Sequence, residues 1–233
     1  MTLEIEVLDH PARACGAMMV GAAIGGGDVV LTGGSTPKAA YAEFAEAVRI
    51  VGLDLADTTF WMGDERCVPA DDPRANYRMI RESLLEPLSD LTVPCLKRIK
   101  GELGPDAGAE EYERELVADG PPEFDLLLLG LGSDGHTASL FPDKPAVREC
   151  EKLVAGVPEA GLEPFVPRVT FTFPLIAKAK RVVVLATGES KAEAVAKAFG
   201  PDAKPDPHVP SSLLPGRVKQ LLVLLDRPAA ERL

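Results

Sequence analysis

The chain has 233 residues, 46% of them hydrophobic and 26% charged, which is long enough for one α/β domain with a sizeable core. Asp and Glu total 36 against 25 Lys and Arg, and the resulting net charge of −11 argues against a nucleic-acid-binding surface. A few converging Arg and Lys side chains could still form a local pocket for an anionic small molecule.

The first part of the chain shows neither a secretion signal nor a membrane-spanning segment. No basic start precedes an apolar core, and the apolar run Ala14–Ile24 is short and interrupted by glycines. The four cysteines are scattered, without a C-x-x-C pair or the spacing of a metal site. We therefore expect a soluble, cytoplasmic protein with reduced thiols, no bound metal and no membrane partner.

Short apolar runs typical of buried strands alternate along the chain with stretches of helical periodicity. The predicted strands are Val29–Leu31, Thr58–Met62, Phe124–Leu129, Val169–Phe173, Val182–Ala186 and Leu221–Leu225. The predicted helices are Pro11–Ile24, Pro37–Val51, Asn76–Leu85, Asp106–Val117 and Lys191–Phe199. This alternation predicts an α/β fold in which one domain, residues 1–233, forms a doubly wound, mostly parallel sheet with helices on both faces. The proline-rich segments 93–105 and 201–215 are expected to be surface loops.

The first loop of chemical interest joins the strand Val29–Leu31 to the next helix and contains Gly33, Gly34, Ser35 and Thr36. Glycines let the backbone approach a ligand closely, and the start of the helix presents free N–H groups. With two hydroxyl groups added, the loop predicts a site for phosphate. It lacks the spacing of a Walker loop, and an ordinary helix cap is the alternative interpretation.

A second loop follows the strand Thr58–Met62 and carries Asp64, Glu65 and Arg66 in succession. The guanidinium of Arg66 can bind a carboxylate, a phosphate or a developing oxyanion. A carboxylate cluster with a histidine could instead hold a divalent metal, but the acidic spacing is irregular and only one histidine is available here. A solvated cluster of charges is the third interpretation.

In a third loop, an apolar strand runs into a glycine-rich turn that holds Asp134 and His136. Ligands bind at the carboxyl ends of strands in open parallel sheets, and histidine can transfer protons near neutral pH. A turn that merely ends a strand would leave this pair unexplained. Gly130, Gly132 and Gly135 match the dinucleotide-binding spacing, but neither a long helix nor an acidic residue at the end of the next strand follows, so we expect no dinucleotide cofactor.

Two basic residues further along the chain are candidates for the same site. Arg168 precedes the strand Val169–Phe173, and Lys191 opens a helix after Gly188. Taken singly, each of these side chains is typical of a surface charge. They can bind an anionic ligand together only if the fold brings them to one pocket.

Together these loops resemble the 6-phosphogluconolactonase family. The matching segments are Gly33-Gly-Ser-Thr-Pro37, Gly63-Asp-Glu-Arg66 with Val68-Pro69, Gly130–Pro142, Pro167-Arg-Val-Thr170 and Gly188-x-x-Lys191. The likeness covers nearly the entire chain, and Asp-Gly-His-Thr-Ala-Ser-Leu-Phe-Pro is its most specific block. One departure is Ala75, where the family commonly has Ser. The resemblance implies a Rossmann-like fold shared with glucosamine-6-phosphate deaminase and, more distantly, ribose-5-phosphate isomerase.

The resemblance also implies an activity: hydrolysis of 6-phospho-D-glucono-1,5-lactone in the oxidative pentose phosphate pathway, without a cofactor. His136 is then the general base for an attacking water, and Asp134 orients its imidazole or holds a charge beside it. Arg66 and backbone N–H groups stabilise the oxyanion. The implied substrate-binding residues are Gly33, Gly34, Ser35, Thr36, Asp64, Arg168 and Lys191. The expected partner is the phosphorylated sugar lactone, and we expect a monomer rather than an oligomer.

Two other functions occur on this fold. The deaminase resembles this chain at the Asp-Gly-His turn but carries a further acid that assists ring opening, where this chain has Phe141, and tends to carry Tyr at the position of Arg66. Sugar-phosphate sensing domains of transcription regulators also share the fold, with an attached helix-turn-helix segment. The sequence shows no such segment, and the residues favour the lactonase.

Overall fold

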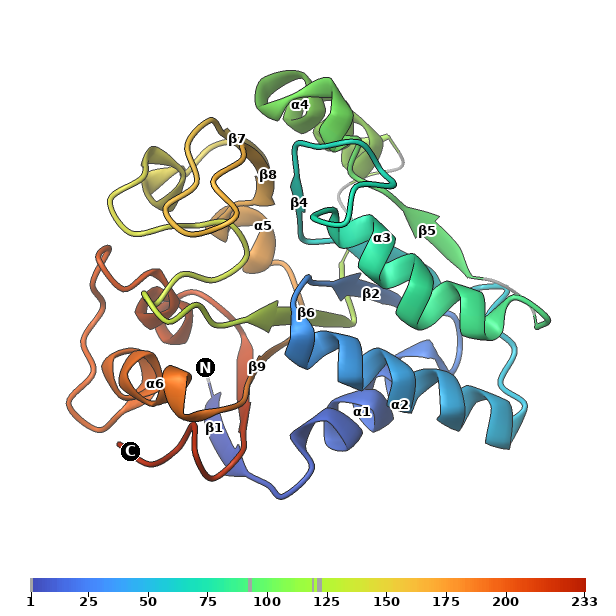
Figure 1. The fold of residues 1–233 in the computed structure, drawn as a ribbon, viewed down its shortest axis with the longest axis horizontal. Coiled ribbons are helices and arrows are strands. Elements are labelled where there is room, and N and C mark those ends of the chain that lie inside the picture. Colours follow the sequence, from blue (N-terminus) through green and yellow to red (C-terminus); the bar gives the residue numbers. More distant parts are fainter. Residues whose placement is uncertain (1, 92–93, 119, 121–122) are drawn as a thin grey trace.

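A seven-stranded sheet runs through the centre of the computed structural model, which describes residues 2–91, 94–118, 120 and 123–233 (Figure 1). Its strand order is β1-β10-β9-β6-β2-β3-β5, and every neighbouring pair is parallel. The strands are β1 (Thr2–Val7), β2 (Asp28–Leu31), β3 (Thr59–Met62), β5 (Cys95–Lys97), β6 (Leu126–Gly130), β9 (Arg181–Ala186) and β10 (Gln220–Leu225). The predicted parallel α/β sheet is confirmed.

A second, antiparallel sheet has the order β4-β8-β7 and consists of β4 (Asp64–Arg66), β8 (Arg168–Phe171) and β7 (Val154–Val157). The chain passes between the two sheets at Gly63, whose N–H donates to Leu31 at 2.9 Å while its carbonyl accepts the N–H of Phe171 at 2.8 Å. The predicted strand at residues 169–173 therefore belongs to this sheet, not to the parallel one. An apolar run indicates burial but does not specify its pairing partner.

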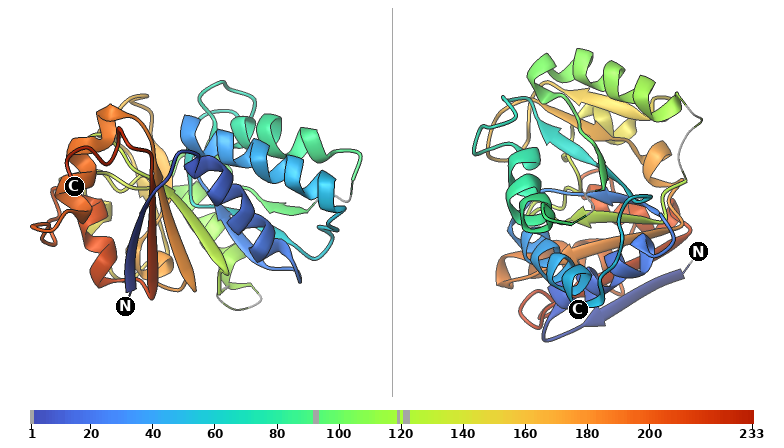
Figure 2. Two further views of the ribbon diagram at one scale, coloured as in Figure 1. Left: turned by 90° about the horizontal axis from the view of Figure 1, so that it is seen from below. Right: turned by 90° about the vertical axis from the view of Figure 1, so that its right-hand side faces the viewer.

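Helices cover both faces of the parallel sheet. The α-helices of the described residues are α1 (Pro11–Ala23), α2 (Ser35–Val51), α3 (Asn76–Ile80), α4 (Pro105–Val117), α5 (Phe173–Ile176) and α6 (Ala192–Phe199), and of these α4 packs on β7 and β8 of the second sheet. In Figure 1, α1 and α2 lie on one side of the row of strands, and α6 and the second sheet lie on the other. Figure 2 shows α4 at the opposite end of the molecule from β1. No helix among the described residues has the length and apolarity needed to cross a membrane.

The two segments predicted as surface loops contain regular structure. In the described part of 93–105, which excludes residue 93, β5 extends the parallel sheet beyond β3, and a 3₁₀ turn at Gly101–Leu103 precedes α4. In 201–215, a 3₁₀ turn begins at Pro210 and continues to Gly216. Both corrections concern elements that are too short to show a periodic pattern.

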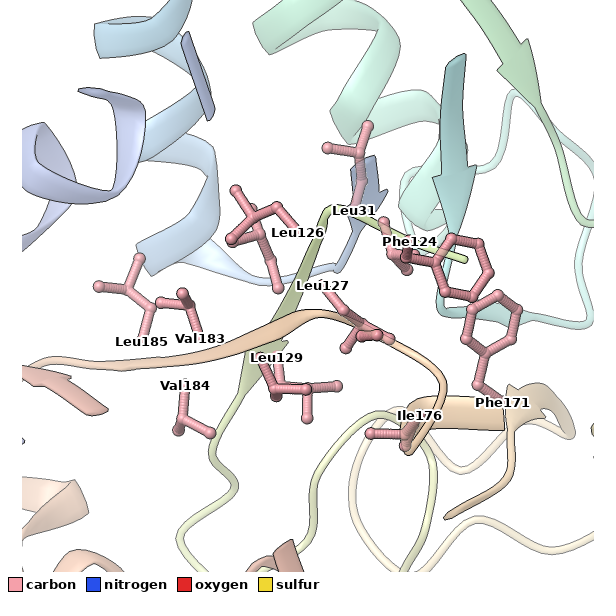
Figure 3. Close-up of a cluster of buried hydrophobic side chains, with 14 of the residues drawn as sticks. Leu31, Phe124, Leu126, Leu127, Leu129, Phe171, Ile176, Val183, Val184 and Leu185 are labelled. Atoms are coloured by element: carbon pink, nitrogen blue, oxygen red, sulfur yellow. The ribbon is translucent and has the colours of Figure 1, made fainter. Parts of the chain in front are cut away.

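The core lies between β6 and its neighbours (Figure 3). Leu127, Leu128 and Leu129 are each at most 1% exposed, because helices and the second sheet cover the two faces of this strand. At one edge of the core, the ring of Phe124 stacks on that of Phe171, with the centroids 5.6 Å apart. This contact joins the parallel sheet to the second sheet.

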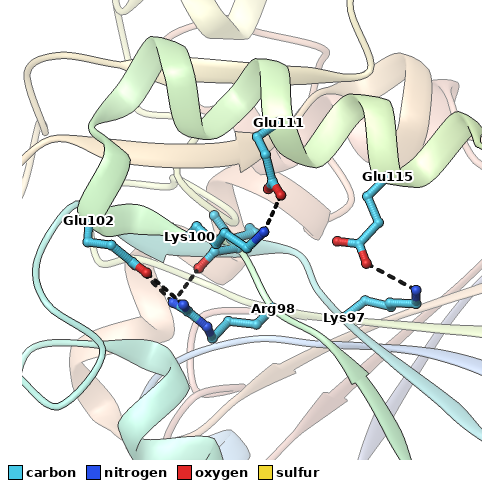
Figure 4. Close-up of polar contacts among 7 residues, drawn as sticks. Lys97, Arg98, Lys100, Glu102, Glu111 and Glu115 are labelled. Atoms are coloured by element: carbon cyan, nitrogen blue, oxygen red, sulfur yellow. Dashed lines mark hydrogen bonds and ion pairs between the residues drawn. The ribbon is translucent and has the colours of Figure 1, made fainter.

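Ion pairs connect α4 to the end of β5 and the segment that follows it (Figure 4), and a buried tyrosine adds a further contact. Lys97 pairs with Glu115 at 3.0 Å, and Lys100 pairs with Glu111. Solvent-exposed pairs of this kind typically stabilise a fold by less than about 1 kcal/mol each. Tyr112 is fully buried and its hydroxyl donates to the carbonyl of Lys97 and accepts the N–H of Met62. The buried tyrosine therefore contributes more to the position of α4 than the ion pairs do.

Candidate active site

A cavity opens where the loops after β2 and β6 meet the second sheet. Seven of the residues predicted to form the site line it, namely Gly33, Gly34, Asp64, Arg66, His136, Arg168 and Lys191. They come from the loops after β2 and β6, from β4 and β8 of the second sheet, and from the turn that precedes α6. The fold thus brings to one place segments that are more than a hundred residues apart in the sequence.

His136 is held by its neighbour in the turn after β6. Its Nδ1 lies 2.6 Å from Oδ1 of Asp134, and the same oxygen accepts the backbone N–H of His136 at 3.1 Å. The turn permits this only because residue 132 is a glycine: a Cβ at Gly132 would lie 2.0 Å from Nδ1. The ring of His136 also packs on Phe141, with centroids 4.6 Å apart. Among the described residues no hydrogen bond engages Nε2 of His136.

The charge of Asp134 fixes the tautomer of this imidazole. Burial is the largest influence on the Asp134 carboxyl and acts to raise its pKa, but the hydrogen bond and charge of His136 outweigh burial and hold the pKa below 3.8. An ionised carboxylate accepts a hydrogen bond, so Nδ1 carries the proton and Nε2 keeps its lone pair. The pair can therefore take a proton from a water molecule in the cavity.

Arg168 brings an unsatisfied positive charge to the cavity. Its side chain is buried, with the residue 2% exposed, and Nη2 donates to the carbonyl of Pro164 at 2.7 Å. Nη1 has no hydrogen-bond partner among the described residues. Burial and the charge of Arg66 lower the pKa of Arg168 to about 10, so the guanidinium remains protonated at neutral pH. A buried guanidinium with an unsatisfied Nη1 is costly, and an anionic ligand would supply the missing acceptor.

Lys191 is the second cation of the cavity wall, from the turn that leads into α6. Burial lowers the pKa of its ammonium group, and the negative charge of Asp134 opposes that change. The charges of Arg66 and Asp64 likewise act on the pKa of Arg168, the first lowering it and the second raising it. The resemblance implied that these two cations share a site, whereas their spacing along the chain does not indicate it.

The loop after β2 differs from its prediction in one respect. Gly33 and Gly34 line the cavity, but Ser35 and Thr36 line a separate depression. The hydroxyl of Thr36 lies 2.9 Å from that of Thr187. Because α2 begins at Ser35, the helical backbone carries both side chains away from the glycines. The structure therefore places these hydroxyl groups outside the cavity that His136 lines, and their binding of phosphate stays a prediction.

Asn76 and Ser139 are cavity residues that the sequence analysis missed. Both donate to Asp64: Ser139 Oγ lies 2.7 Å from Oδ2, and Asn76 Nδ2 lies 3.2 Å from Oδ1 and 3.0 Å from the carbonyl oxygen. These donors hold both carboxylate oxygens of Asp64, which is buried at 7% exposure. Ser139 belongs to the conspicuous block after His136, so it could have been singled out; nothing in the local sequence connects Asn76 with Asp64.

Glu65 stands between two cavity residues but does not line the cavity itself. Its carboxylate is 2% exposed and accepts the backbone N–H groups of Arg66, Asn76 and Tyr77. Burial raises the pKa of Glu65 to about 7 against the lowering effect of these three donors. In the described part of the chain, no three His, Cys, Asp or Glu residues are grouped as a metal site would require.

Comparisons with known proteins agree with this geometry. Residues 13–223 match the family of glucosamine-6-phosphate isomerases/6-phosphogluconolactonase. The 6-phosphogluconolactonase of Synechocystis is 36% identical, with 98% of this chain and 95% of that protein covered. The human 6-phosphogluconolactonase is 39% identical over 87% of this chain and 79% of its own length.

Solved structures give the same result. The 6-phosphogluconolactonase of Trypanosoma brucei superposes with a TM-score of 0.83 at 31% identity, covering 100% of this chain and 99% of that one. A monomeric glucosamine-6-phosphate deaminase reaches a TM-score of 0.80 at 19% identity, with 100% of each chain covered, which shows a shared fold. The chain therefore belongs to the glucosamine-6-phosphate isomerase/6-phosphogluconolactonase family.

Proposed function

We propose that this protein hydrolyses 6-phospho-D-glucono-1,5-lactone to 6-phospho-D-gluconate in the pentose phosphate pathway. Relatives that match nearly the full chain carry the name 6-phosphogluconolactonase. The observation that carries the proposal is one cavity containing both His136, whose Nδ1 is occupied by Asp134, and Arg168, whose Nη1 has no partner among the described residues. A proton acceptor and an anion-binding group thus face the same small space.

In the proposed reaction, Nε2 of His136 takes a proton from water while the water oxygen attacks the lactone carbonyl carbon. Arg66 stabilises the negative charge that forms on the carbonyl oxygen. The ring C–O bond then breaks, and the departing oxygen receives the proton from the imidazolium of His136. A positioned general base contributes about 10²- to 10⁴-fold to a rate. A lactone is an activated ester, so this base and these charges suffice without a cofactor.

The phosphate is proposed to bind to Arg168, to Lys191 and to the backbone of Gly33 and Gly34. Asp64 is held by Ser139 and Asn76 and is proposed to contact the sugar hydroxyls. Binding the phosphate at a distance from the reacting carbon holds the carbonyl against the water and the base. Such positioning can supply a large part of a rate enhancement.

The residue at the position of the deaminase's acid supports hydrolysis over deamination. Phe141, at the position of the deaminase's ring-opening acid, is 2% exposed and packs on His136 as an apolar contact.

All of the proposed groups come from one chain, so we also propose one lactonase domain over residues 1–233 that acts as a monomer. Size-exclusion chromatography with light scattering tests the monomer separately from the activity.

A coupled assay with freshly prepared phosphogluconolactone tests the proposed function. The spontaneous decay of the lactone is measured without protein and subtracted, because a protein that only binds the lactone must not be mistaken for a catalyst. We expect lactone disappearance in proportion to protein concentration and no ammonia release from glucosamine 6-phosphate. Ammonia release without lactone hydrolysis would assign the cavity to the deaminase reaction.

A further inference from the structure

We infer that Glu65 is a positioning residue whose carboxylate ties the end of β4 to the start of α3 and thereby sets Arg66 and Asn76 in the cavity wall. The inference rests on the proposed function for its main readout, since Arg66 and Asn76 are tested by the lactone reaction. Glu65 does not itself line the cavity.

The contacts of Glu65 join two segments that are distant in the sequence. Its Oε1 accepts the N–H of Arg66 at 2.6 Å and that of Asn76 at 2.7 Å, while Oε2 accepts the N–H of Tyr77 at 2.7 Å. Three N–H donors on a carboxylate that is 2% exposed form an extensive set of charge-assisted bonds. Together with the bonds from the Asn76 side chain to Asp64, these contacts hold the start of α3 against β4.

The start of α3 has no other side-chain cap. Ala75 is its N-cap residue and makes no capping hydrogen bond, since alanine has no polar atom. The first N–H groups of a helix need acceptors, and at Asn76 and Tyr77 Glu65 supplies them.

Two cavity residues depend on the placement of these segments. The side chain of Asn76 packs against Gly33, where a Cβ would lie 2.0 Å from its Oδ1, and also donates to Asp64. Arg66 follows Glu65 directly, and its Nη1 donates to the carbonyl of Arg74 at 2.6 Å. A shift of about 1 Å in a group at a reacting centre can lower a rate about 10²-fold. Loosening β4 from α3 would therefore disturb the oxyanion side of the cavity.

The role of Glu65 depends on its ionisation. The titratable and charged groups around it are Asp64, Arg66, Cys67, Tyr77, Arg98 and Arg168. Burial, with a smaller contribution from Asp64, raises the pKa of Glu65 to about 7 despite the three N–H donors. As the pH falls through about 7, Glu65 takes up a proton, and the protonated oxygen is a weaker acceptor for the N–H groups.

The test is the ratio of wild-type kcat/KM to that of Glu65→Gln, measured across pH. The glutamine amide presents N–H groups to N–H donors, so we expect a ratio of about 10 to 100 above about pH 8. Below about pH 6 the wild-type residue is itself neutral, so the ratio should fall toward one. Thermal melting at each pH shows that both proteins are folded.

Glu149→Gln is the matched control. Glu149 also accepts three backbone N–H groups, from Cys150, Glu151 and Lys152, but it lies on the surface away from the cavity. Its variant should keep wild-type kcat/KM at every pH. Glu65→Asp is the second variant of the site: it keeps the charge but is one methylene too short to reach α3, and we expect a several-fold loss of activity above about pH 8.

A ratio near one at all pH values would overturn the inference, as would wild-type activity in Glu65→Asp. A ratio that stays constant across pH would reduce Glu65 to a purely structural residue and would also overturn it. Failure of the proposed function has a different signature, namely a wild-type protein that does not accelerate lactone decay. In that case the Kd of Glu65→Gln for 6-phosphogluconate is divided by that of the wild type at each pH. A ratio of Kd values near one at all pH values, or one that stays constant across pH, would then overturn the inference.

Discussion

Asp134 and His136 show how much a local sequence can specify about a site. They are two residues apart, and a turn that contains Gly132 and Gly135 brings their side chains to 2.6 Å. This contact is local, so the sequence was sufficient to suggest it. By contrast, the hydroxyls of Ser35 and Thr36 were expected in the cavity, and the direction in which α2 starts decides otherwise.

Asp134→Asn tests the tautomer argument at the residue scale. The amide can donate to Nδ1, which would move the imidazole proton to Nε2 and remove the base. We expect kcat to fall about 10²- to 10⁴-fold with little change in the binding of 6-phosphogluconate. Because the hydrogen bond and charge of His136 hold the pKa of Asp134 below its usual value, the wild-type carboxylate should be ionised at neutral pH, as the tautomer argument requires.

The chain provides a control for this substitution. His208 and Asp143 form a second pair with an Nδ1–Oδ1 distance of 2.6 Å, but both side chains are more than 60% exposed. Asp143→Asn should therefore leave kcat unchanged. Equal losses in Asp134→Asn and Asp143→Asn would contradict the specific role of Asp134.

At the scale of elements, long buried segments were predicted within two residues of their observed ends. β6 and α2 are examples, because a continuous apolar run and a helical apolar stripe are each distinctive. β1 was missed, since its alternating Glu4 and Glu6 lie on an edge strand whose partner β10 is at the other end of the chain. The strands of the second sheet and β5 have only three or four residues and acquire their pairing from the tertiary fold.

Two glycines in α1 give a stability prediction. A Cβ at Gly21 would meet nothing within 4 Å, so Gly21→Ala should stabilise the protein by about 0.5–1 kcal/mol through helix propensity. A Cβ at Gly16 would lie 2.9 Å from Cβ of Glu43 and 3.0 Å from the backbone nitrogen of Phe44 in α2. Gly16→Ala should therefore destabilise it by about 1–3 kcal/mol.

Urea unfolding followed by circular dichroism measures both changes. Shifts of the same sign in the two variants would show that helix propensity, rather than the approach of α1 to α2, controls the stability at both positions.

At the scale of the whole molecule, the site is a product of the fold. Arg168 comes from the second sheet and Lys191 from the turn before α6, and neither position carries a local signal that the two share a cavity with His136. Only the resemblance to a family suggested that they converge. Their meeting depends on pairings between distant strands, which spacing along the chain does not encode.

Lys191→Ala tests this convergence. Loss of a charge-assisted contact of about 1.5–3 kcal/mol should raise KM for the phosphorylated lactone about 10- to 100-fold. Activity on unphosphorylated gluconolactone should change little. Lys197→Ala is the control, because Lys197 is exposed and pairs with Glu193 on the outer surface of α6. Equal losses of Lys191→Ala on both substrates would contradict a phosphate-binding role.

The most direct test of the proposed mechanism is the turnover of His136→Ala with 6-phosphogluconolactone, measured beside its affinity for 6-phosphogluconate. We predict that kcat falls about 10²- to 10⁴-fold while the affinity stays near that of the wild type, because the basic groups of the cavity are intact. An unchanged kcat would exclude His136 as the base and contradict the mechanism.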